Sequence, residues 1–284
     1  MKFGLSYNTG FYGTDPDQMI GIARHAEACG FESFYVPEHI ALYVGAMMGP
    51  VPIPPATPIA DPLACLSFVA AATMRICLGT GVLLLPHHHP VALAKQLATI
   101  DVLSKGRMRL LTVGVGALPG EAAAAGIDFS TRGRRADEAI DVLRLLWSGG
   151  EDGVTFDGEF FTFTDLCSFP QPLAPGTLPV HIGGSSNAAA RRAGLRGDGY
   201  FAGGRLTPQQ RAGQLDLMRT TAEAAGRDPD ALEYTRWGSI DATADEVASS
   251  AAQGITRLVV APAATDESEQ RDQISAFADR HGPR

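Results

Sequence analysis

Hydrophobic positions along this chain follow two alternating patterns. Short apolar runs rich in β-branched residues alternate with longer segments in which apolar residues recur at helical spacing. This alternation is typical of strand–helix units repeated around a parallel sheet. We predict eight strands, at residues 3–8, 33–37, 76–85, 108–114, 179–183, 199–202, 234–240 and 257–261.

Helical patterns lie between and after these strands, at about residues 16–29, 62–73, 90–104, 132–147, 187–195, 208–226, 244–253 and 266–281. Several begin with proline directly after Asp or Thr and end before a glycine, which are helix start and stop signals. Eight strands and eight helices close a (β/α)8 barrel better than they form an open sheet. An open doubly wound sheet would have a GxGxxG motif after its first strand, where this chain has Asn-Thr-Gly-Phe-Tyr-Gly.

Two long connections interrupt this rhythm. One is the proline-rich stretch 51–58 after the second strand, and the other spans residues 153–172 after the fourth helix. Loops of this length are functional or disordered in most proteins. The second contains VTFDGEFFTF, in which alternating aromatic runs flank Asp157-Gly158, a strong hairpin signal. We therefore predict a small hairpin insertion over an edge of the barrel.

Length and composition support a single domain over residues 1–284. A (β/α)8 barrel of about 250 residues would use nearly all of the 284. Hydrophobic residues make up 45% of the chain, but glycine, proline or charge breaks each apolar stretch before the ~18 residues that a membrane span needs. The start, MKFGLSYNTGF, alternates like a strand and lacks the features of a signal peptide. We expect a cytoplasmic protein with no membrane partner.

Charge and cysteine content narrow the range of partners. The formal net charge of −8 argues against nucleic acid and anionic membranes, since both bind basic patches. The four cysteines, at 29, 65, 77 and 167, are scattered and form no CxxC pair, so we expect reduced thiols. A small-molecule substrate is the partner that this composition allows.

The segment Gly183-Gly184-Ser185-Ser186 lies between a predicted strand and a predicted helix, on the loop side that carries the active site in (β/α)8 barrels. Backbone N–H groups and the helix dipole can hold a phosphate there, while glycines let the anion approach and serines add donors. The alternative is an ordinary strand-to-helix turn with serine as the helix cap. For the isolated segment the two interpretations are evenly matched.

Three further places carry candidate chemistry. Gly81, within Thr80-Gly81-Val82, interrupts a strand, which indicates a bulge or a close approach to a ligand. Glu38-His39 follows the second strand, where histidine can transfer protons, and a surface or capping pair is the alternative. His87-His88-His89 invites a metal site, but adjacent side chains in a turn diverge and no acid with clear ligand spacing accompanies them. We expect no metal there.

Residues 76–116 read ICLGTGVLLLPHHHPVALAKQLATIDVLSKGRMRLLTVGVG. This stretch resembles the luciferase-like monooxygenase superfamily, in particular its oxidoreductases that depend on the deazaflavin coenzyme F420. Further matches are the Glu38-His39 pair, the segments TRGRRADE, FDGEFFTF and VHIGGSS, and a DGW-like turn at residues 197–200. The resemblance runs from residue 1 to about residue 261 and implies a luciferase-like (β/α)8 barrel.

The resemblance also implies roles for individual residues at the cofactor. Thr80, Gly81 and Val82 would cup the central part of the deazaflavin ring, with a cis peptide between the last two. His89 and Gly114 would lie on the cofactor side. Gly183 to Ser186 would hold the phosphate, which tips the balance between the two interpretations of that turn.

The proton donor or acceptor is expected to be His39, because histidine ionises near neutral pH and relatives have a histidine at the matching position. Glu38 beside it is the second catalytic candidate. Neighbours on an extended segment point to opposite sides, so we expect Glu38 to face away. Some relatives also have acids just after the first and fourth strands. Here the first is absent and the second is displaced to Glu121, so a sugar-phosphate dehydrogenase reaction does not follow.

Three functions compete at this point. The leading one is hydride transfer between F420 and an unidentified small organic substrate. The closest rival is an FMN-dependent monooxygenase that uses reduced flavin and O2, and the third is a barrel that binds flavin or deazaflavin without turnover. The resemblance implies a homodimer. Apolar and aromatic residues expected at the pocket walls indicate a hydrophobic or planar substrate: Tyr7, Phe11, Tyr12, Met47 and Met48.

Overall fold

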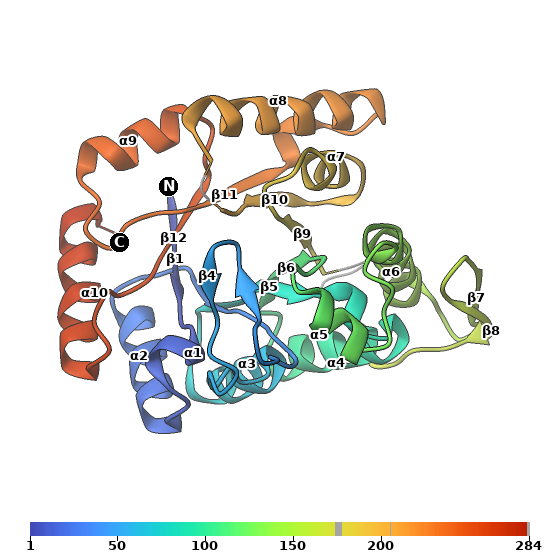
Figure 1. The fold of residues 1–284 in the computed structure, drawn as a ribbon, viewed down its shortest axis with the longest axis horizontal. Helices are drawn as coiled ribbons and strands as arrows, with labels where there is room; N and C mark the ends of the chain where they lie inside the picture. The colour runs from blue at the N-terminus through green and yellow to red at the C-terminus, as the bar shows by residue number, and fades with distance from the viewer. Residues whose placement is uncertain (174–177, 205, 283–284) are drawn as a thin grey trace.

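A computed structural model of the chain describes residues 1–173, 178–204 and 206–282. Eight parallel strands form a closed barrel in the order β1-β12-β11-β10-β9-β6-β5-β2. They are β1 (Lys2–Ser6), β2 (Ser33–Val36), β5 (Cys77–Leu84), β6 (Met108–Gly114), β9 (Val180–Gly183), β10 (Gly199–Ala202), β11 (Glu233–Trp237) and β12 (Arg257–Val260). Each coincides with a predicted strand, so the (β/α)8 prediction is confirmed (Figure 1).

Helices surround the strands (Figure 1). They are α2 (Pro16–Ala28), α3 (Pro62–Ala72), α4 (Pro90–Leu103), α6 (Arg132–Ser148), α7 (Asn187–Arg196), α8 (Pro208–Ala224), α9 (Ala244–Ala252) and α10 (Glu267–His281). Asp15, Asp61 and Thr207 accept hydrogen bonds from first-turn N–H groups, so the start signals in the sequence act as N-caps. None of the helices described is both long and apolar enough to cross a bilayer.

The inside of the barrel is filled by side chains rather than open. Tyr35, Leu110, Phe201 and Val259 form a small buried cluster contributed by four strands. A Cβ atom at Gly4 or Gly79 would lie 2.8 Å from the Tyr35 ring, so glycine in the flanking strands makes room for this aromatic side chain. The barrel therefore has a packed interior, and ligands must approach from its ends.

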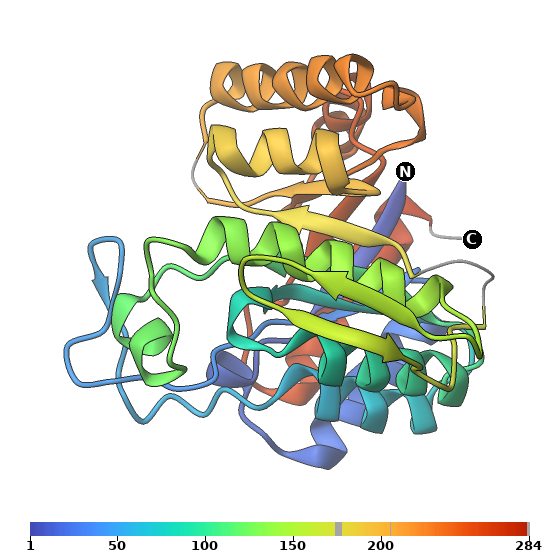
Figure 2. The same ribbon diagram turned by 90° about the vertical axis from the view of Figure 1, so that its right-hand side faces the viewer.

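Several short elements that the sequence patterns did not predict follow the carboxyl ends of the strands. They are α1 (Thr9–Tyr12), β3 (Met47–Met48), β4 (Val51–Pro52), the 3-10 turn η1 (Leu85–His87) and α5 (Pro119–Ala124). A further 3-10 turn, η2 (Pro229–Ala231), precedes β11. In Figure 2 the β3–β4 hairpin and α5 project on the same side of the molecule, away from the chain's amino terminus. The carboxyl end of the barrel is thus covered by elements too short to leave a periodic signal.

The predicted insertion is a two-stranded antiparallel hairpin of β7 (Val154–Asp157) and β8 (Thr162–Leu166), which lies in front of α6 in Figure 2. Glu138 of α6 anchors its tip. The carboxylate accepts hydrogen bonds from the backbone N–H groups of residues 159, 160 and 161 at 2.9, 2.9 and 2.7 Å. The hairpin prediction is therefore confirmed, and its contact is with the outer helices.

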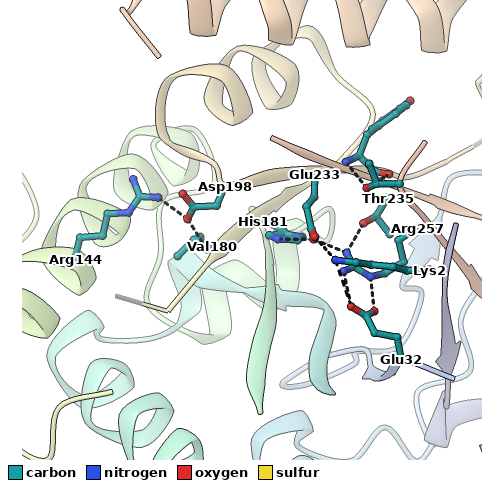
Figure 3. A network of polar contacts seen from close by, with 11 residues as sticks. Lys2, Glu32, Arg144, Val180, His181, Asp198, Glu233, Thr235 and Arg257 are labelled. Carbon is teal, nitrogen blue, oxygen red and sulfur yellow. Dashed lines mark hydrogen bonds and ion pairs between the residues drawn. The ribbon is translucent and has the colours of Figure 1, made fainter. Parts of the chain in front are cut away.

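A charged network lies at the end of the barrel where the strands begin (Figure 3). Arg257, only 1% exposed, donates to both oxygens of Glu32 at 2.7 and 2.9 Å and to Glu233 at 2.7 Å. Burial alone would raise the pKa of Glu233, but hydrogen bonds from Arg257 and Lys2 lower it to about 2. Burial, helped by the charge of Arg257, lowers the pKa of His181 to about 4. This end therefore contributes to stability, and His181 is buried as the neutral ring.

Candidate functional site

The candidate site lies at the carboxyl ends of β2, β5 and β6. Three segments meet there: residues 38–41 after β2, residues 81–88 at the end of β5 and in η1, and α5 after β6. Hydrogen bonds between their side chains and backbones join all three segments. In barrels of this type, the loops that follow the strands carry the reacting groups.

His39 is held by a carboxylate that the sequence analysis did not assign to it. Its Nδ1 lies 2.9 Å from Oε2 of Glu121, whose side chain is fully buried. The other oxygen of Glu121 accepts from the backbone N–H groups of Ile40 at 2.7 Å and Ala41 at 3.4 Å. Burial would raise the pKa of Glu121, but the bond and charge of His39, together with the two N–H groups, lower it below its usual value.

This contact decides which ring nitrogen of His39 can react. A carboxylate accepts a hydrogen bond and does not donate one when ionised, so Nδ1 carries the proton in the neutral ring. Nε2 then carries the lone pair, and it has no hydrogen-bond partner within the part of the chain that the structure describes. His39 can therefore accept or return a proton at Nε2 while Glu121 stabilises the charged form.

The side chain of Glu38 was expected to face away from His39, and it contacts other residues than that ring. The side chain is buried, and its oxygens accept from the backbone N–H of Leu84 at 2.5 Å and contact Nε2 of His88 at 2.8 Å. β2 ends at Val36, so residues 38 and 39 lie in the loop after this strand. Glu38 ties the loop after β2 to the end of β5 and has no recorded contact with His39.

The stretch Thr80-Gly81-Val82 is irregular. The peptide between Gly81 and Val82 is cis, and the pairing of β5 with β6 shifts register there. The Thr80 hydroxyl donates to the backbone carbonyl of Thr112 at 2.8 Å, so it is committed to the neighbouring strand. The carbonyl of Val82 accepts from the N–H of Glu38 at 3.1 Å, which joins this stretch to the loop after β2.

Gly114 and Gly183 have a packing role that the sequence analysis did not foresee. A Cβ atom at Gly114 would lie 2.6 Å from Cγ2 of Val82, and one at Gly183 would lie 2.4 Å from Cγ1. The Val82 side chain therefore fits between the ends of β6 and β9 only because both positions are glycine. These two glycines define where the stretch around Val82 can lie.

The turn from Gly183 to Ser186 contains the helix cap that was one of the two interpretations of this segment. Ser186 is the N-cap of α7, and its hydroxyl accepts from the N–H of Ala189 at 3.1 Å. Gly184 has a φ of +125°, a conformation that favours glycine. Its carbonyl accepts from the Tyr200 hydroxyl at 2.9 Å, and the carbonyl of Ser185 accepts from Gln214. Side chains of β10 and α8 therefore fix the backbone of this turn through its carbonyl groups.

The part of this turn that leads into α7 faces solvent. Residues 185–188 are exposed, and no hydrogen bond is recorded from their four backbone N–H groups to another described residue. These groups begin a helix of 10 residues, whose amino end carries a partial positive charge. The arrangement suits a phosphate, because the anion can accept several N–H bonds at once.

The three adjacent histidines diverge, as predicted. His88 contacts Glu38, and the ring of His89 is exposed and packs edge-on against Phe161 of the hairpin, 5.4 Å between centroids. The ring nitrogens of His87 are buried without a partner among the described residues, and burial lowers its pKa. The structure thus places His89 against the insertion, while His87 lies beside Gly116 at the end of β6. Within the described ranges, no three His, Cys, Asp or Glu side chains are arranged to hold a metal.

The expected apolar pocket walls divide into two groups. Tyr7 and Tyr12 are buried in the core, and the Tyr12 hydroxyl donates to the carbonyl of Pro262 at 2.6 Å. Their assignment to an accessible wall is therefore wrong, because the ring of Tyr7, directly after β1, and that of Tyr12, in α1, are both buried. Phe11, Met47 and Met48 are exposed at the catalytic end and remain available to a ligand.

Comparison with known proteins gives a consistent set of matches. The family model described as luciferase-like monooxygenase matches residues 1–281. An uncharacterized protein of Mycobacterium tuberculosis is 34% identical over 190 residues, which cover 64% of this chain and 65% of that protein. The F420-dependent glucose-6-phosphate dehydrogenase of Beutenbergia cavernae is 32% identical over 260 residues, which cover 81% of this chain and 71% of that protein.

Two solved structures share the fold over almost their whole length. The monooxygenase RslO1 from Streptomyces bottropensis has a TM-score of 0.81 at 22% identity and covers 100% of this chain and 99% of its own. An F420-dependent secondary alcohol dehydrogenase, in complex with an F420–acetone adduct, has a TM-score of 0.81 at 18% identity and covers 99% and 98%. At these identities the likeness concerns the fold alone.

Proposed function

Because the chain belongs to the luciferase-like monooxygenase family, we propose that it is an F420-dependent oxidoreductase that transfers hydride between the deazaflavin and a small organic substrate. Two relatives at 30% and 32% identity are F420-dependent dehydrogenases, which supports the choice of cofactor. The observation that carries a catalytic role is the His39–Glu121 pair, which holds one imidazole nitrogen and leaves the other open at the catalytic end.

The residues at this end suit such a cofactor. The open N–H groups of residues 185–188 would take its phosphate, and the stretch Thr80-Gly81-Val82 would lie along its ring. When bound, the deazaflavin supplies the hydride acceptor or donor, a chemistry that no side chain can provide. The protein's share is to orient the ring and substrate and to manage the accompanying proton.

His39 would manage that proton at Nε2. In the direction of substrate oxidation, the neutral ring accepts the proton that the substrate loses, and Glu121 stabilises the resulting imidazolium. In the opposite direction the same imidazolium returns the proton. Glu38 takes no direct part, and it is a positioning residue that joins the loop of His39 to the end of β5 through Leu84.

An FMN-dependent monooxygenase is the second candidate. The observation that favours it is the family itself, together with the fold neighbours described as monooxygenases. The open N–H groups at α7 would accept the phosphate of either cofactor, so this feature does not separate the two. A barrel that binds either cofactor without turnover is the third possibility, and the His39–Glu121 geometry argues against it.

A side-by-side titration of the purified protein with F420 and FMN tests the proposal. We expect tighter binding of F420, together with slow reaction of the reduced protein with O2. Tighter binding of FMN and rapid consumption of O2 would instead assign the protein to the monooxygenases. If neither F420 nor FMN bound, the proposed function would be wrong, because the His39–Glu121 pair would have no cofactor to assist.

Two further expectations accompany this proposal. We propose a homodimer, because relatives of the resembling family are expected to form one, and Phe68, Met74 and Leu103 are exposed apolar side chains that a partner could cover. We also propose a cytoplasmic location, which suits free cysteines at all four positions. Sedimentation and cell fractionation test these two statements.

A further inference from the structure

Two arginines without an acidic partner lie together on the outer side of β11. Arg236 belongs to β11, and Arg211 belongs to the first turn of α8. Neither forms an ion pair with any carboxylate in the described ranges. Arg211 donates to the carbonyl of Leu206 at 2.6 Å, but its Nε is buried with no hydrogen-bond partner. A buried guanidinium donor without a partner costs free energy unless a ligand satisfies it.

Both arginines line one recess of about 510 Å³ between β11, α8 and α9. Hydroxyl and amide groups of Ser239, Ser249 and Gln253 also line it. Two acidic side chains, Asp245 and Glu246, line it as well, from the first turn of α9. Glu246 is occupied there, because it accepts from the backbone N–H and the hydroxyl of Thr243 in a capping box.

Tyr234, on the same strand as Arg236, also has a hydroxyl without a partner among the described residues, but it does not line the recess. The residue is 3% exposed, and its hydroxyl forms no hydrogen bond with another described residue. Burial raises the pKa of Tyr234, while the positive charges of Arg236 and Arg211 act in the opposite direction. Burial and the charge of Arg211 also lower the pKa of Arg236, so the two guanidinium groups repel each other.

The recess lies apart from the reaction site. Successive residues of a strand face opposite sides, and the Trp237 ring packs on Phe201 of the barrel interior, 4.9 Å between centroids. Arg236 therefore faces outward on the other surface of β11. The open turn at residues 185–188 belongs to β9 and α7, and none of its residues lines this recess.

We propose that this recess is a second anion site, which binds a phosphate group through the guanidinium forks of Arg211 and Arg236. Planar guanidinium groups match the oxygen spacing of phosphate and bind it in a bidentate manner. The recess is larger than a bare phosphate needs, so the ligand class is a small phosphate ester. Its binding would join the start of α8 to β11.

Calorimetric titration with inorganic phosphate and with glycerol 3-phosphate, at ionic strength matched with NaCl, tests the site in the full chain. We expect saturable binding, tighter for the ester, and about a tenfold or greater loss of affinity in Arg211→Gln and in Arg236→Gln, since a charged hydrogen bond is typically worth 1.5–3 kcal/mol. Tyr234→Phe should leave this binding unchanged, because Tyr234 does not line the recess. Tighter binding of inorganic phosphate than of the ester would overturn the assigned ligand class.

Two control variants separate this site from others. Ser185→Glu blocks the turn at α7 and should leave binding in the recess intact. Arg75→Gln removes one positive charge, as the two arginine variants do, but from an exposed position just before β5. Loss of all phosphate binding in Ser185→Glu, equal affinity in wild type and the arginine variants, or no binding beyond that of chloride would each overturn the proposal.

Thermal unfolding separates a binding role from a structural one. Without phosphate, Arg211→Gln should unfold at the same temperature as the wild type or higher, because the substitution relieves repulsion between two cations. With phosphate, the wild type and the two controls should gain more stability than the arginine variants do. A lower unfolding temperature in Arg211→Gln without phosphate, combined with an unchanged response to phosphate, would identify this arginine as structural.

Discussion

The imidazole of His39 and the carboxylate of Glu121 meet at 2.9 Å although 82 positions separate them in the chain. The loop after β2 supplies the first residue and the short helix α5 after β6 supplies the second. Two backbone N–H groups next to His39 bind the same carboxylate, so Glu121 fixes both the ring and the loop that carries it.

Replacing His39 with alanine should lower turnover by about 10²–10⁴, the range typical of general acid–base help. Cofactor affinity should stay within about threefold, because the phosphate turn lies on a different strand. Steady-state rates and a binding titration measure the two effects. His25→Ala, a substitution of the same kind on α2 outside the barrel, is the control. Normal turnover in the His39 variant would show that water or another group exchanges the proton.

Glu121→Gln should separate two roles of Glu121, which are to orient the loop after β2 and to place a negative charge beside His39. The amide oxygen can still accept from the N–H of Ile40, so the unfolding temperature should stay within a few degrees of the wild type. Turnover should fall by roughly 10–10³, since the imidazolium loses its counter-charge. The pKa of Glu121 lies below its usual value, so the carboxylate is charged in the folded protein at neutral pH. Equal losses of stability and turnover would instead indicate a structural role.

Ser185→Glu should weaken binding of F420 and of FMN alike. The new carboxylate would lie among the open N–H groups at the start of α7 and repel a phosphate there, with a loss of about tenfold or more. Serine is the appropriate position to change, because Gly184 has a φ of +125° that a side chain would strain. Ser268→Glu, exposed in the first turn of α10, is the matched control. Unchanged affinity would move the phosphate elsewhere.

Gly183→Ala should disturb the segment around Val82. The added methyl group would lie 2.4 Å from Cγ1 of Val82, and overpacking of this kind costs about 1–3 kcal/mol. We expect lower stability and weaker cofactor binding. Val82→Ala in the same chain should restore part of both, because it removes the clashing atoms. A double variant no better than Gly183→Ala would mean that the glycine serves the ligand and not the packing.

His181 should make stability depend on pH between about 6.5 and 4. Its pKa falls from 6.5 to about 4 on folding, so at pH values between these the unfolded chain binds the extra proton and stability declines as pH falls. His181→Gln should remove this decline, on the order of 3 kcal/mol for a buried ring. Thermal unfolding across that range measures the slope, with His281→Gln as control. An unchanged slope would assign the decline to other groups.

Glu233, in the same network, should make stability depend on pH at lower pH values than His181 does. Its pKa of about 2 in the folded protein lies below its ordinary value of 4.5, so its contribution is complete above the latter and is lost as pH falls toward the former. The Glu233→Gln variant should therefore show a flatter stability profile below pH 4.5. This measurement also reports on Arg257, which would lose one of its two carboxylate partners.

The sequence by itself determined the barrel, because its evidence is local. The alternation of apolar runs and helical periods, the prolines after Asp15 and Asp61, and the Asp157-Gly158 turn each depend on a few neighbouring residues. All eight barrel strands and the hairpin follow from such signals. The position of His39 at the catalytic end also followed, since the end of a strand fixes the side of the barrel to which its next residue belongs.

Only the tertiary structure decided how the candidate residues are used. Glu121 reaches His39, Glu38 turns inward to His88, and Val82 lies against Gly183 because of the paths that irregular loops take. These loops have no period from which a side-chain direction can be derived. The pairing of Arg211 with Arg236 depends in the same way on how α8 packs beside β11. Contacts between distant residues are set by packing, which the order of residues along one segment does not contain.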